Sequence, residues 1–199
     1  MSDSESIEAL FAGASVLRSK DLEERGFSRT AIREAVAAGR MDRVGRGLYA
    51  LPGADIGAHH SLVVVARRVP QAVICLLSAL EFHELTTQVS HEVWIAIGPK
   101  DRKPEFEHPP LRVLRYGLAH AALGVEEHEV EGATLRIYSV ARTVVDLFRY
   151  RNKVGIDVAL EALREGWRDR RFTLAELNRI ARVCRMGRVM KPYLEALTA

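Results

Sequence analysis

The chain has 199 residues, of which 48% are hydrophobic, and this is enough apolar material for one large or two small domains. No apolar run is long enough to span a membrane, and the N-terminal stretch MSDSESIEALFAG is acidic where a targeting leader would be basic, so we expect a cytoplasmic protein with no membrane partner. The net charge is only +3, which by itself does not indicate a nucleic-acid-binding protein.

The first recognisable pattern is a pair of short helices between residues 16 and 40. Ser19 is the expected N-cap of the first helix, which ends at Gly26. Ser28 is the expected N-cap of the second helix, and Gly39 follows its last turn. The sequence therefore predicts two helices joined by a turn that contains a glycine.

The second helix has one apolar and one polar face. Ile32, Ala35 and Val36 fall on one side at helical spacing, which makes them the expected core face. Arg29, Thr30 and Arg33 lie on the outward arc, where the side chains of a recognition helix would reach base edges and phosphates in a major groove. The alternative is the solvated face of a small helical hairpin.

The next stretch, DRVGRGLYALPG at residues 42–53, reads as a hairpin with an arginine between two glycines at its tip. A hairpin after two short helices is typical of a winged helix-turn-helix. Arg43 and Arg46 would then be placed to contact backbone phosphates or to enter a minor groove. We expect a DNA-binding domain at residues 1–53, although this segment carries eight basic and eight acidic residues.

The middle of the chain alternates between strand and helix patterns. A helix is expected in AHHSLVVVARRV, and Ser78 is the expected cap of another in SALEFHEL. Strands are expected in AVICLL, HEVWIAIG and LRVLRYG, followed by a hairpin that turns at Glu131 and Gly132. The segment PKDRKPEFEHPP is expected to be a loop.

From Ser139 onwards the pattern is helical, with Thr173 as a second expected N-cap. Arg142 and Asp146 are four residues apart on one helix, which indicates a salt bridge or a shared polar network. The predicted fold class is α+β: an N-terminal winged helix-turn-helix, then a second domain at residues 54–199 with a mixed α/β region and a helical tail from about residue 139.

The tail is also the most basic part of the chain, because residues 149–199 carry 12 basic and 6 acidic residues. Within it, arginines recur every three residues and form a basic stripe: Arg179, Arg182, Arg185 and Arg188. A solvated face is the commonest meaning of such a stripe, and an acidic protein surface or RNA are the more specific alternatives.

The sequence gives little support to an enzyme. It contains no GxSxG, HExxH or phosphate-binding glycine loop, and Glu92 and Lys100 do not form a compact nuclease-like arrangement. Cys75 and Cys184 lie far apart and the histidines are scattered, so we expect neither a disulfide nor a metal site. We expect no catalytic residue and no cofactor, with a nuclease as the weakest alternative.

Three motifs in order, VGRGLYALP, LLSALEFHEL and YSVARTVVDLF, resemble the AbiEi family of antitoxins and transcriptional regulators from type IV toxin–antitoxin systems. The resemblance implies an autorepressor that binds an inverted repeat upstream of its own operon and counteracts a co-encoded nucleotidyltransferase-like toxin. By position, it implies DNA reading by Arg29, Thr30, Arg33 and Arg46. Val140 departs from the family pattern, which often has a proline there.

A second hypothesis stays open beside this one. The chain would be a protein-binding module that neutralises an acidic or toxin partner directly through its basic C-terminal stripe. The sequence leaves open whether neutralisation needs contact, and whether the protein is a monomer or a dimer, because it contains no heptad pattern.

Overall fold

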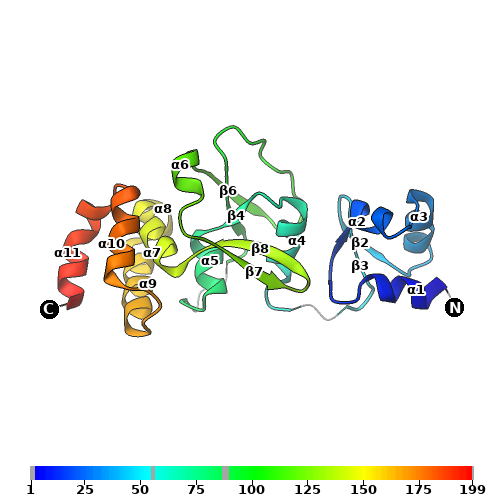
Figure 1. Ribbon diagram of the computed structural model, residues 1–199, viewed down its shortest axis with the longest axis horizontal. Coiled ribbons are helices and arrows are strands. Elements are labelled where there is room, and N and C mark those ends of the chain that lie inside the picture. Colours follow the sequence, from blue (N-terminus) through cyan, green and yellow to red (C-terminus); the bar gives the residue numbers. More distant parts are fainter. Residues whose placement is uncertain (1–2, 55–56, 87–89, 199) are drawn as a thin grey trace. The chain divides into compact units, whose positions relative to one another are not determined.

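The computed structural model of the protein describes residues 3–54, 57–86 and 90–198 (Figure 1). The chain forms two compact units. The N-terminal unit combines Met1–Gln71, Pro104–Pro109 and His128–Leu135, and the C-terminal unit contains Ala72–Lys103, Pro110–Glu127 and Arg136–Ala199. Helices and sheets occur together, so the predicted α+β class is confirmed. The functional domain boundary at residue 53 stays a prediction.

The N-terminal unit contains a three-stranded antiparallel sheet in the order β1-β3-β2. Its helices and strands are α1 (Asp3–Leu10), β1 (Leu17–Arg18), α2 (Ser19–Glu24), α3 (Arg29–Ala37), β2 (Asp42–Gly45), β3 (Leu48–Ala50) and α4 (His60–Arg68). Its core includes apolar side chains from α1, α2 and α3: Ile7, Phe11, Leu22, Ile32 and Ala35. The burial of Ile32 and Ala35 confirms the predicted core face of the second helix.

The local signals around α2 and α3 are mostly confirmed. The Ser28 hydroxyl accepts a hydrogen bond from the backbone N–H of Ala31 at 3.1 Å, and Gly26 and Gly39 both have positive φ angles. The prediction of Ser19 as an N-cap was wrong, because Arg18 occupies that position with an extended backbone. Its N–H donates to the Asp21 carboxylate at 2.9 Å, so the acidic residue satisfies this end of the helix.

The C-terminal unit is organised around a five-stranded mixed sheet in the order β6-β5-β4-β8-β7. The elements before the helical tail are β4 (Val73–Ile74), α5 (Leu76–Phe82), β5 (Val93–Ile97), β6 (Leu111–Arg115), α6 (Leu118–Ala121), β7 (Val125–Val130) and β8 (Ala133–Tyr138). The last two strands form a hairpin whose tip, His128–Leu135, belongs to the N-terminal unit. The predicted hairpin turn is confirmed, with φ angles of 47° at Glu131 and 71° at Gly132.

Five helices follow the last strand: α7 (Val140–Arg149), α8 (Arg151–Val154), α9 (Ile156–Arg168), α10 (Leu174–Val183) and α11 (Gly187–Thr198). They pack against one another, and α7 also packs on α5 (Figure 1). Ser139 and Thr173 cap α7 and α10 through their hydroxyls, as predicted.

Two predictions in this unit were wrong. The stretch AVICLL is not one strand, because β4 ends at Ile74 and Leu76 already begins α5. Ser78 is not a cap but a buried residue inside α5, where its hydroxyl accepts a hydrogen bond from the Trp94 backbone N–H at 3.0 Å. This serine therefore joins the helix to β5, which its place in the sequence does not reveal.

Candidate nucleic-acid interface

Helix α3 presents a polar face to solvent. Because Ile32 and Ala35 are buried against the core, Arg29, Thr30 and Arg33 are left exposed on the opposite side. The Ser28 cap starts the helix directly before Arg29 and so fixes where these side chains leave the backbone. The structure thus brings three of the predicted site residues onto one accessible surface.

Arg29 has an acidic partner on the preceding helix. Its Nε donates to Glu23 Oε1 at 2.7 Å, and this hydrogen bond to the carboxylate raises the pKa of Arg29. The Arg29 side chain is 80% exposed, and exposed ion pairs of this kind contribute little to stability. A phosphate or a base edge can therefore take the place of Glu23. No ion pair joins Arg33 to any residue in the described part of the chain.

The β2–β3 hairpin carries the other two predicted arginines. Arg46 and Gly47 form its turn, Gly47 has a φ angle of 71°, and the register shifts between Arg43 and Gly45. The side chains of Arg43 and Arg46 are both exposed. Of the two glycines that frame Arg46, only Gly47 adopts the left-handed conformation that the sequence analysis anticipated for the tip.

The turn of this hairpin lies beside a cationic residue that the sequence analysis had not assigned to the interface. Arg68, at the C-terminal end of α4, donates from Nη1 to the backbone oxygen of Arg46 at 2.6 Å. A hollow of about 800 Å³ lies here, and its charged lining consists of Arg43, Arg46, Arg68, Glu105, Glu107 and His108. Arg68 is 22 residues from Arg46 in sequence, so no local pattern could have predicted this contact.

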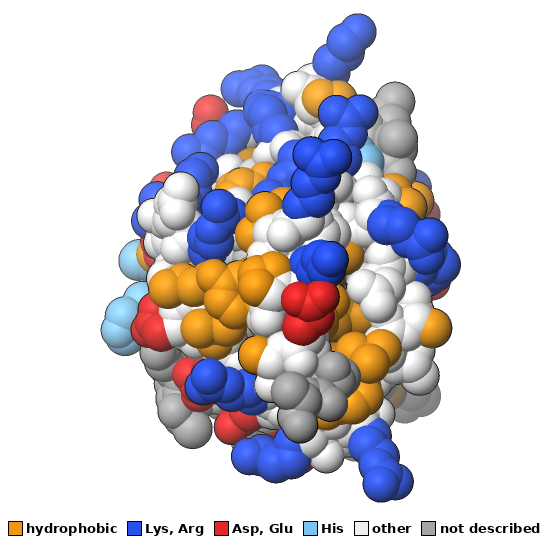
Figure 2. Space-filling view, turned by 90° about the vertical axis from the view of Figure 1, so that its left-hand side faces the viewer, with side chains coloured by type: hydrophobic (Ala, Val, Ile, Leu, Met, Phe, Trp, Pro, Cys, Tyr) orange, Lys and Arg blue, Asp and Glu red, His pale blue; other side chains and the backbone are white. Residues whose placement is uncertain are grey.

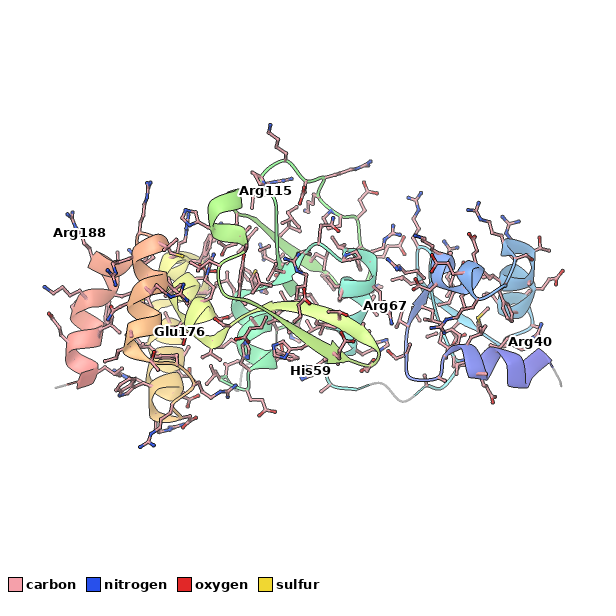
Figure 3. The ribbon with its side chains drawn as sticks, in the orientation of Figure 1. Arg40, His59, Arg67, Arg115, Glu176 and Arg188 are labelled. Carbon is pink, nitrogen blue, oxygen red and sulfur yellow. The ribbon has the colours of Figure 1, made fainter. Side chains whose placement is uncertain are left out.

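The tip of the β7–β8 hairpin supports the same unit. The carboxylate of Glu131 accepts hydrogen bonds from the Ser15 hydroxyl and from His60 Nδ1, the latter at 3.0 Å. Burial acts to raise the pKa of Glu131, but these hydrogen bonds outweigh it, and the pKa lies below its ordinary value. Arg67 (labelled in Figure 3) donates to the Gly132 carbonyl at 2.5 Å, so α4 is fixed to the hairpin tip.

One family of known proteins matches the N-terminal part of the chain. Residues 5–52 match the family described as "Transcriptional regulator, AbiEi antitoxin". We call residues 5–52 the AbiEi segment. The AbiEi segment contains α2, α3 and the β2–β3 hairpin, so the resemblance seen in VGRGLYALP is confirmed. The motifs LLSALEFHEL and YSVARTVVDLF lie outside it, and what they imply stays a prediction.

One solved structure shares the fold over most of the chain. The crystal structure of the RV2827C protein from Mycobacterium tuberculosis superimposes with a TM-score of 0.61 at 17% sequence identity. The similarity covers 88% of this chain and 69% of that one, and at this identity it shows the fold alone. No curated protein sequence matches the chain.

Beyond the AbiEi segment, the predicted basic stripe is exposed. Arg179 and Arg182 lie on α10, Arg185 in the following turn and Arg188 on α11, from which it extends into solvent (Figure 3). No described acidic residue forms an ion pair with them, and Val183 beside them is 43% exposed. Figure 2 faces these C-terminal helices and shows Lys and Arg side chains around hydrophobic ones. We call these four arginines the basic C-terminal face.

Arg142 and Asp146 form the polar network predicted for α7, and it is fully buried. Arg142 Nε lies 2.9 Å from Asp146 Oδ2, and Tyr116 donates its hydroxyl to the same oxygen at 3.1 Å. Arg142 Nη1 also donates to the carbonyls of His120 and Leu123. Burial raises the pKa of Asp146 despite the neighbouring guanidinium. The network ties α7 to the chain before β7 and presents no surface to a ligand.

The residues that the structure describes include no group of three or more His, Cys, Asp and Glu side chains that could hold a metal ion. None of the helices in the described part of the chain is long and apolar enough to cross a membrane.

Glu92, the carboxylate of the nuclease alternative, forms an ion pair with Arg112 at 2.8 Å. Cys75 and Cys184 are buried thiols, and burial raises the pKa of Cys75 well above its ordinary value.

Proposed function

We propose that this protein is a DNA-binding transcriptional regulator in which α2, α3 and the β2–β3 hairpin act as a winged helix-turn-helix. The observation that carries the proposal is α3 itself, which buries Ile32 and Ala35 and exposes Arg29, Thr30 and Arg33. The match of residues 5–52 to a family of transcriptional regulators supports it independently.

In this function α3 is the recognition helix and enters the major groove. Arg29 and Arg33 reach guanine O6 and N7 or the adjacent phosphates, and the Thr30 hydroxyl contacts a base edge. The hairpin is the wing, whose Arg43 and Arg46 contact phosphates or a narrow minor groove. Sequence would then be read mainly by α3, while the wing sets the orientation of the protein on DNA.

The regulated gene is the protein's own operon, and its operator is an inverted repeat. The same operon encodes a nucleotidyltransferase-like toxin that this protein counteracts as a type IV antitoxin. These finer statements rest on the resemblance of the whole chain to AbiEi antitoxins. The protein works in the cytoplasm and is not an enzyme. Two copies occupy the inverted repeat, either as a dimer or as monomers that bind together.

Fluorescence anisotropy of the full-length protein tests the DNA-binding function. The probes are the duplex upstream of its own coding sequence and a scrambled duplex of equal composition, each measured across salt concentrations. We expect tight binding to the upstream duplex alone. Changing both Arg29 and Arg33 to alanine should weaken it by at least about thirtyfold, because two base contacts of about 1–3 kcal/mol each are lost.

The matched control removes two positive charges elsewhere. Arg179→Ala with Arg182→Ala, on the basic C-terminal face, lowers the net charge equally and should leave the affinity for the upstream duplex nearly unchanged. If the α3 double variant binds that duplex as tightly as the wild type, α3 is not the recognition helix.

A second candidate function is direct binding of a protein partner through the basic C-terminal face. It is favoured by four exposed arginines that form no ion pair with described residues, and by the exposed Val183 next to Arg182 in the sequence. Such a surface complements an acidic protein surface with an apolar centre. Reversing the charge of Arg182 and Arg185 should abolish co-purification with the protein encoded by the adjacent gene and leave DNA affinity intact. Retained co-purification would contradict this role.

A further inference from the structure

The turn at the tip of the wing is held from both sides by hydrogen bonds to its two carbonyl groups. The Gly47 oxygen accepts a bond at 3.0 Å from the backbone N–H of Ser19, at the start of α2. The Arg46 oxygen accepts a bond at 2.6 Å from the guanidinium of Arg68. The direction in which the Arg46 side chain leaves the tip therefore depends on one contact with α2 and one with α4.

Of these two contacts, the one from Arg68 comes from outside the AbiEi segment. Arg68 lies at the end of α4, whereas the family match ends at residue 52. Its bond to Arg46 is charge-assisted, and such bonds are stronger than those between neutral groups. Gly47, the second residue of the turn, gives the backbone freedom to move when this bond is absent.

We propose that Arg68 is a positioning residue for DNA binding, which holds the wing so that Arg46 meets the DNA backbone. The inference rests on the proposed function and deepens it, because it adds α4 to the elements that position the DNA-contacting side chains. Arg68 acts through the backbone of Arg46 and does not itself bind DNA.

The charges around the hollow favour this indirect role over a direct contact with phosphate. Glu105 and Glu107 line the same hollow as Arg68, and Arg43 and Arg46 complete its charged rim on the hairpin side. A phosphate that approached Arg68 there would also approach two carboxylates, which offset part of the attraction of the three arginines. The carbonyl of Arg46 is a neutral acceptor and meets no such penalty.

A double-mutant cycle in the full-length protein tests the inference. Anisotropy with the upstream duplex across salt concentrations compares the wild type with Arg46→Ala, Arg68→Ala and the double variant. We expect Arg68→Ala to weaken binding by about two- to tenfold, and by no more than Arg46→Ala does, because Arg68 acts only through Arg46. In the double variant the loss should equal that of Arg46→Ala alone, since the wing then has no arginine side chain to position.

Two further variants separate positioning from charge and from folding. Arg68→Lys keeps a donor for the carbonyl and should recover part of the affinity. Arg164→Ala removes an equivalent exposed charge from α9 and should change nothing. Without DNA, the backbone amide resonance of Gly47 should shift in Arg68→Ala and stay in place in Arg164→Ala.

Three outcomes would overturn the role of Arg68. The first is wild-type affinity in Arg68→Ala, and the second is a double variant in which the losses of the two single variants multiply. The third is a salt dependence of binding whose slope falls by about one from Arg46→Ala to the double variant. The last outcome would mean that Arg68 contacts a phosphate directly. Failure of the wild type to bind either duplex is a different result, because it contradicts the proposed DNA-binding function as a whole.

Discussion

At the scale of single residues, the α7 pair shows how a charge is accommodated in the core. Arg142 and Asp146 have no exposed surface, and each relies on the other for its main ionic partner. The guanidinium also lies over the Tyr138 ring, 4.5 Å from its centroid. Because water cannot reach either group, the loss of one partner leaves the other charge buried and uncompensated.

Arg142→Met should therefore lower the free energy of unfolding by about 3–5 kcal/mol, measured by urea denaturation at pH 7. Arg142→Met combined with Asp146→Leu should lose less than the single variant, because no isolated charge remains. Arg164→Met, an exposed arginine on α9, is the control and should have little effect. A double variant less stable than Arg142→Met would contradict this account.

The same scale shows what could be predicted from sequence. Ser28, Gly39 and the Arg142–Asp146 pair were predicted because their partners lie within four residues, inside one helix or at its end. The contacts of Glu131 with His60 and of Arg68 with Arg46 join residues 71 and 22 positions apart. No periodicity links such residues, so only the folded structure reveals them.

At the scale of elements, the cap of α3 decides how firmly the candidate recognition helix begins. Ser28→Ala removes the acceptor for the Ala31 N–H and should cost about 1 kcal/mol of unfolding free energy. Ser28→Asp keeps an acceptor and should restore most of it. Ser61→Ala, in the first turn of α4 but not at its cap, is the matched control in the same urea titrations. Equal losses at Ser28 and Ser61 would refute the capping role.

A second prediction at this scale concerns the contact between the turn of the β7–β8 hairpin and the loop after α1. A Cβ on Gly132 would collide with the Gly13 carbonyl and lie 2.9 Å from the Cα of Ala14. Gly53 has a similar φ angle, 65° against 71°, but an added Cβ there meets nothing within 4 Å. Gly53→Ala should thus lower the free energy of unfolding by about 1–2 kcal/mol through backbone strain. Gly132→Ala should lower it clearly more, because the collision adds to this strain. Thermal unfolding of the two variants makes the comparison, and equal losses would show that the contact is unimportant.

Element types were predicted better than element boundaries, for a physical reason. The AVICLL stretch has the apolar character of a buried strand, yet only two of its residues pair in the sheet. Leu76 adopts a φ angle of 46°, which turns the chain out of β4 and into α5. Tertiary packing around Ser78 and Trp94 sets this boundary, and local propensity does not encode it.

At the scale of the whole molecule, two carboxylates link stability to pH. Burial acts to raise the pKa of Asp21, but hydrogen bonds from Arg18 outweigh it, and the pKa of Asp21 lies below its ordinary value, as does that of Glu131. For both groups the unfolded chain binds protons more readily than the folded one. Their contribution to stability is therefore complete above their unfolded pKa values of 3.8 and 4.5 and is lost as the pH falls through the lower folded values.

The wild type should consequently lose unfolding free energy as the pH falls below about 5, measured by urea titrations at each pH. Glu131→Gln should be less stable than the wild type at pH 7 and should show a shallower loss on acidification. Glu161→Gln, a carboxylate on α9, serves as the control and should keep the wild-type slope. An unchanged slope in Glu131→Gln would rule out a contribution from this carboxylate.

The N-terminal unit is assembled from three separate stretches of chain, and the last of them is His128–Leu135. During translation this stretch leaves the ribosome well after the AbiEi segment. The 64 residues from Gln71 to Leu135 take roughly 3 to 13 s to synthesise at about 5–20 residues per second. A nascent chain that has completed α2, α3 and the β2–β3 hairpin still lacks the Glu131 partner of Ser15 and His60. Completion of the N-terminal unit is thereby coupled to synthesis of most of the polypeptide.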